Sequence, residues 1–496
     1  MLLEMHCHTS RYSRCSQASA ASLVRQVKKK ELQGVIITEH HYLWVEDEIK
    51  ALRIEAGLDE NFLIMTGQEV ETDIGHVLVF GANRTIEEEI SLKDLRAFFP
   101  DAGLVWAHPF RNGNIPDKSK LLNPILDAIE IFSMNQTPKE NYLGLKAWHK
   151  YKFTASSGSD AHTEDMAGVY PTQFDHPVIT MQGLVTEIKK SRCRPFFKEI
   201  PKSGANIIVT EITIGTKGDD ESRSRIILKN ITDDKKWEAT KASASINAFL
   251  CKNGFGEGQF RVPGIIDIND RERLIIEAGQ RGKNLFDLLI HVDRSIGMNY
   301  FKLAAQWLAR FHNKSIKQGD AESAIKKERK RFNSYLNSFV RTNSPYLKKI
   351  GPVINLVKDK EEEIYSKARG SFILNHGDYH PKNIIIGQDR QQDITTLFIS
   401  IIDFGNNILF PRSFDVGYFL SQFESQFYAY PEVLKYCRES DFIDTYIKES
   451  DVILPDFRAQ VSLFKIRANL SIAAYLIKVG KGQTPEMEAL VSRCVS

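Results

Sequence analysis

The first 200 residues alternate between short apolar runs and segments of helical periodicity, and this alternation restricts the fold more than any other feature. The apolar runs are residues 34–38, 62–66, 76–80, 104–107 and 128–132. Runs this short and this apolar are typical of buried strands, and strands that alternate with helices indicate repeated β/α units. Residues 16–32 fit this pattern, with apolar side chains on one helical stripe and basic ones opposite. The N-terminal part is therefore predicted to form a barrel-like β/α fold.

The chain of 496 residues is too long for one hydrophobic core, so two to four folded units are expected, and two are preferred. No apolar run approaches the roughly 18 residues that a membrane span needs, so no membrane association is predicted. The six cysteines form no CxxC pair, which favours reduced thiols. The start, Met1 to His6, lacks the basic and apolar segments of a secretory signal. A cytoplasmic protein is expected.

The β/α pattern breaks at residues 196–204, where proline, glycine and charged residues predict turns and a domain boundary. Residues 207–214 and 225–231 then flank a polar tip at 216–222, as expected of a hairpin. Asp233 or Asp234 can cap a helix that runs to about Leu250. A further strand is predicted from Leu274, and mainly helical periodicity from Leu285.

The stretch Ile325-Lys-Lys-Glu-Arg-Lys-Arg331 is the strongest basic cluster in the chain. Sparse aromatic residues and nearby acids favour a solvated helix face over a nucleic-acid surface. The net charge of +3 adds no argument for nucleic acid.

Histidines and acids recur at or just after the predicted strands. His6 and His8 are two residues apart, so in an extended segment both project from the same face toward one ion. A barrel gathers such strand-end residues at one site. The candidate metal ligands are His6, His8, His40, Glu69, His76, His108, Asp160 and His162.

These ligand types suit zinc, manganese or iron, and a carboxylate such as Glu69 can bridge two ions. Closely spaced ions lower the pKa of a shared water and hold a phosphate ester during in-line attack. Metal-assisted phosphoester hydrolysis is therefore predicted. Any single histidine, such as His41 or His149, is more simply explained by packing. Glu130 fits either strand packing or an outer contact to a ligand.

The ordered motifs resemble the polymerase and histidinol phosphatase (PHP) family of phosphoesterases over residues 1–198. The matching segments are His6-Cys-His8-Thr, Thr38-Glu-His40-His, the Glu69 and His76 segment, Ala107-His108-Pro, Ile129-Glu-Ile-Phe, Gly158-Ser-Asp160-Ala-His162 and residues 172–195. The resemblance implies a distorted β/α barrel that binds two or three divalent metals (Mn, Zn or Fe). Glu39 departs from the family pattern, which has Asp before the second-motif histidine.

A second set of motifs lies in the C-terminal half, in His376-Gly-Asp378-x-His-Pro-x-Asn383 and Ile402-Asp403-Phe. Phosphoryl transfer needs magnesium ligands and a carboxylate that orients or deprotonates the acceptor hydroxyl. Asp378 can fill the carboxylate role. Asn383 and Asp403 are the candidate magnesium ligands, and Asp403, at the end of the apolar run 397–402, would also bridge to the nucleotide phosphates.

A lysine on an upstream strand is expected to contact the nucleotide phosphates, and Lys229 fits this role. Glu238 is its ion-pair candidate, in competition with Asp233 and Asp234. The hairpin around residue 216 lacks GxGxxG, which leaves other phosphate contacts unassigned.

Over residues 205–496 these motifs resemble the aminoglycoside phosphotransferase and choline kinase group. The resemblance implies a two-lobed protein-kinase-like fold that uses Mg-ATP, with a small lobe at about 205–280 and a large lobe at about 281–496. It also implies that Asp415 is structural and that His376 and His380 brace the catalytic loop.

The sequence therefore predicts a bifunctional α/β enzyme with domains at 1–198 and 205–496. Its expected partners are a small phosphate ester, a small hydroxyl acceptor and ATP. One alternative is a single active domain regulated by a nucleotide-binding partner domain. Another is a nucleic-acid end-processing nuclease and kinase, which requires salt-dependent oligonucleotide binding.

Overall fold

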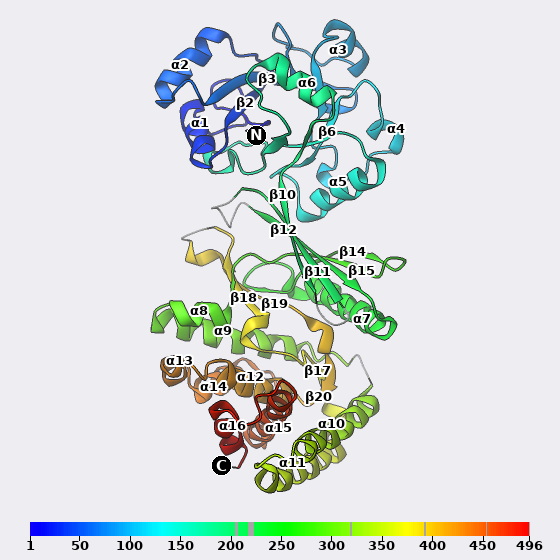
Figure 1. Cartoon of the computed structure of the whole chain (residues 1–496), viewed down its shortest axis with the longest axis vertical. Coiled ribbons are helices and arrows are strands. Elements are labelled where there is room, and N and C mark those ends of the chain that lie inside the picture. The colour runs from blue at the N-terminus through cyan, green and yellow to red at the C-terminus, as the bar shows by residue number, and fades with distance from the viewer. Residues whose placement is uncertain (204–206, 217–222, 318–319, 391–392, 453, 496) are drawn as a thin grey trace. The chain divides into compact units, whose positions relative to one another are not determined.

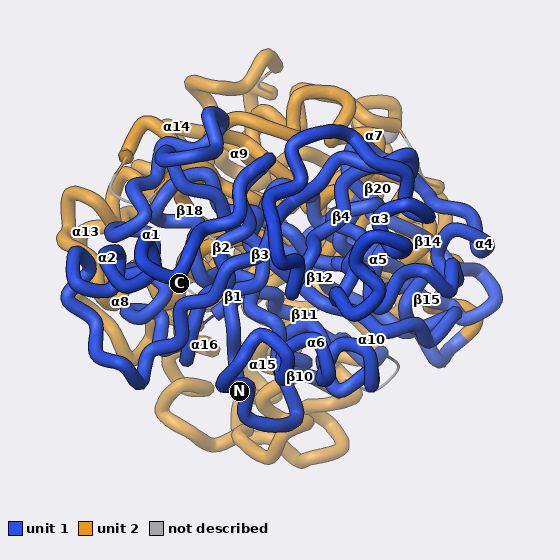
Figure 2. Tube along the Cα trace, turned by 90° about the horizontal axis from the view of Figure 1, so that it is seen from above, with its two compact units in different colours: residues 1–233, 265–279 blue, residues 234–264, 280–496 orange. Residues whose placement is uncertain are grey.

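The computed structural model describes residues 1–203, 207–216, 223–317, 320–390, 393–452 and 454–495 (Figure 1). Contacts divide the chain into two units, coloured separately in Figure 2. Unit 1 comprises residues 1–233 and 265–279, and unit 2 comprises residues 234–264 and 280–496.

Unit 1 begins with a sheet in the order β7-β6-β5-β4-β3-β2-β1-β8-β9. Its strands are β1 (Leu2–Glu4), β2 (Gly34–His40), β3 (Leu63–Thr72), β4 (Gly75–Phe80), β5 (Gly103–Trp106), β6 (Ala128–Phe132), β7 (Ala155–Ser157), β8 (Thr172–Phe174) and β9 (Cys193–Pro195). Ser157 N donates to Thr172 Oγ1 at 2.9 Å, and Thr172 Oγ1 donates to Ser157 O at 2.6 Å. These bonds join β7 to β8 and nearly close the sheet into a barrel.

Strand β4 runs antiparallel to both β3 and β5, whereas β1–β2–β3 and β5–β6–β7 are parallel. The β/α repeat predicted from the sequence is therefore wrong at this strand. The cause is the two-residue link between Thr72 and Gly75, which is too short for a crossover helix. Gly75 has φ +103°, a conformation that few other residues adopt.

Helices surround the strands of the barrel (Figure 1). They are α1 (Ala20–Lys29), α2 (Glu46–Ala56), α3 (Leu92–Phe98), α4 (Lys118–Leu121), α5 (Pro138–Tyr151) and α6 (Met181–Lys189). Their apolar faces pack on the sheet; Leu23, Val24 and Val27 of α1 are fully buried. This arrangement confirms the distorted β/α barrel.

A second, five-stranded sheet of unit 1 has the order β10-β11-β12-β15-β14 and is antiparallel throughout. Its strands are β10 (Phe197–Ser203), β11 (Ile207–Ile214), β12 (Ser224–Ile231), β14 (Ile265–Asn269) and β15 (Leu274–Ala278). The β11–β12 pairing confirms the predicted hairpin, but residues 217–222 of its tip lie outside the described residues. The turns predicted at 196–204 are wrong for 197–203, because these residues pair along β11. As an edge strand, β10 tolerates Pro201.

The five-stranded sheet shares a hydrophobic core with the barrel. Ile212, Ile214, Ile226 and Ile276 belong to the same buried cluster as Phe132 of β6. Lys146 of α5 also forms an ion pair with Asp267 of β14 at 2.5 Å. This shared core explains why the sheet groups with unit 1 although the sequence assigned it to a small lobe. The domains 1–198 and 205–496 stay a prediction.

Unit 2 contains a sheet of order β13-β19-β18-β16 and the pair β17-β20. The strands are β13 (Phe260–Arg261), β16 (Lys283–Asn284), β17 (Ile373–Asn375), β18 (Ile384–Gln388), β19 (Leu397–Ile401) and β20 (Ile408–Phe410). The helices are α7 (Asp234–Leu250), α8 (Leu285–His291), α9 (Arg294–Asn313), α10 (Ala321–Arg341), α11 (Leu347–Ala368), α12 (Ser413–Gln426), α13 (Pro431–Tyr436), α14 (Glu439–Glu449), α15 (Phe457–Lys478) and α16 (Pro485–Val495).

These helices bury a core rich in aromatic residues, with Phe301, Trp307 and Phe419 fully enclosed. The predicted fold class, a barrel followed by a kinase-like α+β part, is confirmed. None of the helices in the described ranges has the length and apolar character that crossing a membrane requires.

Candidate functional site

The barrel brings all eight predicted metal ligands to one edge of its sheet. His6 and His8 follow β1, His40 ends β2 beside Glu69 of β3, His108 follows β5, and Asp160 and His162 follow β7. Because β4 is reversed, His76 at its start lies at this same edge, where Ala107 N donates to His76 O at 3.0 Å. The reversal of β4 therefore places His76 in the site.

The eight side chains form three groups whose donor atoms lie within 4.8 Å of one another. These groups are His6, His8, Glu69 and Asp160; Glu69, His76 and His108; and His8, His40 and His162. Glu69 and His8 each belong to two groups. His8 Nε2 lies 3.1 Å from Glu69 Oε2 and 3.3 Å from Asp160 Oδ1.

The donor set fits divalent metals. Imidazole nitrogens and carboxylate oxygens suit zinc, manganese or iron, and a buried carboxylate shared by two groups is suited to bridging. His6 Nε2 lies 3.2 Å from His8 Nε2, so two ring nitrogens face the same point. Two ring nitrogens this close can bind the same cation once neither carries a proton.

Glu130 orients His6. His6 Nδ1 lies 3.1 Å from Glu130 Oε1, and the other ring nitrogen, Nε2, faces Glu69 and Asp160. Glu130 Oε2 also accepts from the backbone N–H of His108 at 3.1 Å. A carboxylate behind a ligating histidine fixes its tautomer and orientation. The sequence left open whether Glu130 only packs in its strand or contacts a ligand, and these hydrogen bonds support contact with the ligand His6.

The charges of the site favour bound cations. Burial opposes ionisation of Glu69, but the nearby imidazoles of His6, His108 and His76 hold the pKa of its carboxyl well below the ordinary value. Burial lowers the pKa of His40 to about 4, so this imidazole is neutral near pH 7, as a metal ligand must be. Despite burial, the neighbouring carboxylates raise the pKa values of His6, His8 and His76, so these imidazoles hold protons that a bound cation would displace.

Glu39 does not belong to the three groups. It is fully buried and accepts hydrogen bonds from Thr9 N, Ser13 Oγ and Trp44 Nε1. Ser13 Oγ lies 3.4 Å from His8 Nδ1. Glu39 therefore holds the loop that carries His8, and its longer side chain is accommodated there.

Two polar residues that contact Asp160 were not identified from the sequence. Asn135 Nδ2 donates to Asp160 Oδ2 at 2.8 Å, and Arg111 Nη1 lies 3.4 Å from the same oxygen. Arg111 follows His108 by three residues, and this proximity was the available signal. With its side chain 40% exposed, Arg111 places a positive charge at the rim of the site.

The second candidate site lies in unit 2 around Asp378. Tyr418 OH donates to Asp378 Oδ1 at 2.7 Å, and Asn406 Nδ2 donates to Oδ2 at 3.3 Å. Burial and the adjacent Asp378 raise the pKa of Tyr418 far above its ordinary value, so the phenol keeps its proton. The carboxylate of Asp378 is thus held in a fixed orientation.

Asn383 and Asp403 lie at adjacent ends of paired strands. Ile384 of β18 pairs with Ile401 of β19, and Ile402 N donates to Asn383 O at 3.0 Å. Asn383 Nδ2 donates to the backbone oxygen of Asp378 at 3.0 Å, so the bond uses the amide nitrogen and not the side-chain oxygen of Asn383. The predicted Asp, Asn and Asp therefore share one location.

Three of the predicted site residues have positive φ angles: His108 at 31°, Asp160 at 49° and Asp403 at 66°. Non-glycine residues rarely adopt this conformation, which costs on the order of 1 kcal/mol or more and concentrates at functional sites.

Asp415 anchors the loop that carries Asp378. Its carboxylate accepts from His376 N at 2.6 Å and Gly377 N at 2.9 Å. His376 accepts from Asp378 N through Nδ1 and donates through Nε2 to Ile402 O at 3.1 Å. His380 Nδ1 accepts from Lys382 N at 3.2 Å. These contacts are those expected of loop-bracing residues.

The remaining predicted residues are Lys229 and Glu238. Lys229 of β12 forms an ion pair with Glu277 of β15 at 2.9 Å. Glu238 is exposed on α7. The roles of Lys229 at the nucleotide phosphates and of Glu238 as its partner stay predictions.

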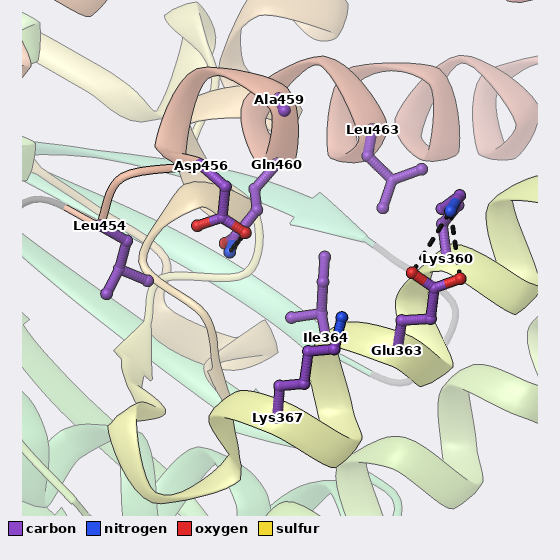
Figure 3. A pocket seen from close by; sticks show the side chains of 9 residues that line it. All are labelled: Lys360, Glu363, Ile364, Lys367, Leu454, Asp456, Ala459, Gln460 and Leu463. Atoms are coloured by element: carbon purple, nitrogen blue, oxygen red, sulfur yellow. Dashed lines mark hydrogen bonds and ion pairs between the residues drawn. The ribbon is translucent and has the colours of Figure 1, made fainter.

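A cavity of about 370 Å³ lies between α11 and α15, away from the motifs of unit 2 (Figure 3). It is lined by Ile364, Leu463 and an ion pair of Lys360 Nζ with Glu363 Oε1 at 3.1 Å. Its lining contains no residue of either predicted site.

Two family models match the chain. Residues 138–193 match the model described as PHP-associated, and residues 292–447 match the ecdysteroid kinase-like family. These matches confirm both resemblances, and residues 292–447 are kinase-like. No curated protein matches the chain.

Several solved structures are similar to parts of this chain. PsfC from Pseudomonas syringae PB-5123 is 20% identical, with 40% of this chain and 91% of that one covered and a TM-score of 0.32. Choline kinase from Cryptosporidium parvum Iowa II is 14% identical, covers 60% and 88%, and has a TM-score of 0.39. Ethanolamine kinase from Plasmodium vivax is 14% identical, covers 60% and 81%, and has a TM-score of 0.36.

Proposed function

We propose that the chain is a bifunctional enzyme in which the barrel hydrolyses a phosphate ester and the kinase-like part phosphorylates a small-molecule hydroxyl with ATP. The observation that carries the hydrolase half is the convergence of six histidines on the carboxylates of Glu69 and Asp160. The observation that carries the kinase half is the fixed carboxylate of Asp378 beside Asn383 and the strand end that leads to Asp403.

In the hydrolase half, the three groups of ligands would hold two or three divalent metals (Mn, Zn or Fe). Such ions supply Lewis acidity and an activated water when bound. The protein's own part is to fix the ligands: Glu130 orients His6, and Glu39 holds the loop of His8. Arg111 at the rim is placed to attract the anionic ester.

In the kinase half, Asp378 orients the acceptor hydroxyl and accepts its proton. Asn383 and Asp403 would hold magnesium, which neutralises phosphate charge when bound. Tyr418 and Asn406 keep the Asp378 carboxylate in one orientation, which reduces the entropy lost on reaching the reactive geometry.

The hydrolase half is tested by incubating the protein with Mn²⁺ and a panel of phosphomonoesters. Phosphate release should fall in both His108→Ala and Asp160→Asn. The loss should exceed the roughly 10–100-fold that is typical when a residue that only hydrogen-bonds to a metal ligand is changed. Glu187→Gln is a matched control, because Glu187 pairs with His176 at 2.9 Å outside the cluster. Release that is unchanged in both site variants would remove this half.

The kinase half is tested with Mg-ATP and a panel of alcohols. Asp378→Asn should lower transfer about 10²–10⁴-fold, the usual contribution of a general base. Asp389→Asn is the control, because Asp389 forms a half-exposed ion pair with Arg261. Equal transfer by both variants would contradict the assignment.

A further inference from the structure

A cavity of about 220 Å³ adjoins the Asp378 loop within unit 2. Gly377 and Asn406 line it, and Asn406 Nδ2 donates to Asp378 Oδ2 at 3.3 Å. The cavity therefore opens beside the carboxylate that receives the acceptor's proton. Asp378 does not itself line the cavity, and Asn406 is the residue that both lines it and contacts the Asp378 carboxylate.

Helix α10 gives this cavity a basic wall. Ser323, Lys327 and Arg331 all line it and follow one another at intervals of four residues, so they share a helix face. Lys327 and Arg331 come from the basic stretch that the sequence attributed to a solvated helix face. Lys327 is solvent-exposed, as that prediction requires, and it also lines the cavity together with Arg331.

The positive charge of this wall is only partly balanced. Arg331 Nη1 lies 3.0 Å from Glu328 Oε2, but the same carboxylate accepts from Arg467 Nε at 2.5 Å, so two guanidinium groups share one anion. In the described part of the chain, no carboxylate lies within ion-pair distance of Lys327. Burial and the neighbouring Arg331 lower the pKa of the Lys327 ammonium, as expected of a cation in positive surroundings.

One acid also lines the cavity. Asp320 begins α10, where its side chain accepts from Glu322 N at 2.9 Å as the helix cap. Its charge is thus engaged by the helix end. The apolar part of the lining consists of Ala324 of α10 and of Ile408, Leu409 and Phe414.

We infer that the acceptor of the kinase half is a small hydroxy compound that carries an anionic group, either a carboxylate or a phosphate. This inference rests on the proposed kinase function. Lys327 and Arg331 bind the anionic group while the hydroxyl faces Asp378. A cationic acceptor such as choline is disfavoured, because it would lie against like charges.

The proposed reaction transfers the γ-phosphoryl group of ATP to the hydroxyl oxygen of the acceptor. The acceptor oxygen forms a bond to the γ-phosphorus, and the bond from that phosphorus to the β,γ-bridging oxygen breaks. The hydroxyl proton passes to Asp378, and ADP leaves with the electron pair of the broken bond.

The test measures transfer from Mg-ATP to glycerol, D-glycerate, glycerol 3-phosphate, ethanolamine and choline. We expect kcat/KM to be at least tenfold higher for an anionic member than for glycerol, and lowest for the cations. The two anions separate a carboxylate from a phosphate site. Equal or higher kcat/KM for glycerol or a cation, or no transfer to either anion, overturns the inference.

Variants localise the effect. Lys327→Gln should raise KM for the anionic acceptor about tenfold, because it removes a charged contact. Lys326→Gln, on the exposed face of the same helix, should leave KM unchanged and serves as the control. Equal KM values in both variants would refute the role of Lys327.

ATP hydrolysis without acceptor separates the two proposals. If it is lost in Asp378→Asn while cations are the preferred acceptors, the kinase function stands and the anionic acceptor is wrong. If wild type neither hydrolyses ATP nor transfers phosphate, the kinase function itself fails and the inference fails with it.

Discussion

His6 Nδ1 donates to Glu130 Oε1 at 3.1 Å, and both side chains are fully buried. This bond turns the other ring nitrogen of His6 toward Glu69 and Asp160. Glu130, in the middle of β6, thus sets the orientation of the imidazole of His6, the first predicted ligand.

Glu130→Gln should weaken metal binding about 10–100-fold, because the amide no longer fixes the tautomer of His6. Affinity is measured by competition with a fluorescent chelator, with thermal melting as a check on folding. Glu187→Gln removes a comparable glutamate–histidine pair and should bind metal as wild type does. Equal affinity in the two variants would contradict the role of Glu130.

Gly158→Ala should also weaken metal binding. A Cβ at this position would overlap Glu130 Oε1 and the Cβ of His6, so the two residues must separate. Gly103→Ala is the matched control in the same barrel, since its added Cβ would meet only ordinary contacts at 3.5 Å or more. Isothermal titration with Mn²⁺ compares the two, and unchanged affinity in Gly158→Ala would count against this packing.

Tyr418→Phe should lower kcat of phosphotransfer about tenfold or more, because a hydrogen bond to the charged Asp378 is lost. KM for ATP should change little. Tyr475→Phe, which alters an exposed side chain on α15, should match wild type in steady-state assays. A drop of equal size in both variants would refute the specific role of Tyr418.

Glu361 should make stability depend on pH. Burial, together with the adjacent Glu328, raises the pKa of its carboxyl to about 8. In the unfolded chain the group ionises near its ordinary pKa, so the folded state holds an extra proton between about pH 5 and 8. The free energy of unfolding therefore falls as pH rises through this window and levels off above it.

Urea unfolding of wild type and Glu361→Gln at pH 5, 6, 7 and 8 measures this effect. As pH rises, the free energy of unfolding of wild type should fall, whereas that of Glu361→Gln should not fall for this reason, so the variant should become more stable relative to wild type. Glu363→Gln, an exposed change on the same helix, should follow wild type. Parallel curves for wild type and Glu361→Gln would exclude this role.

Much of the barrel was predictable because short apolar runs mark buried strands. The run at 34–38 became β2, and the run at 128–132 became β6 without change. The reversal of β4 was missed because an apolar run shows that a strand is buried but not whether it runs parallel or antiparallel to its neighbours. The short link between Thr72 and Gly75 was the available signal.

The metal candidates were predictable because several motifs combine residue type with fixed spacing. Arg111 and Asn135 were missed because a single polar residue has no spacing to distinguish it. The packing of the five-stranded sheet on the barrel was also missed. Alternation in 207–214 shows that one face is buried, but it does not show which surface covers that face.

Anomalous diffraction from crystals grown with Mn²⁺ tests the central claim most directly. The account predicts at least two peaks in the barrel, about 2.0–2.3 Å from ligand atoms that include His6 Nε2 and His8 Nε2, with Glu69 shared between two peaks. If crystals soaked in saturating Mn²⁺ show no anomalous peak at these side chains, the account is contradicted.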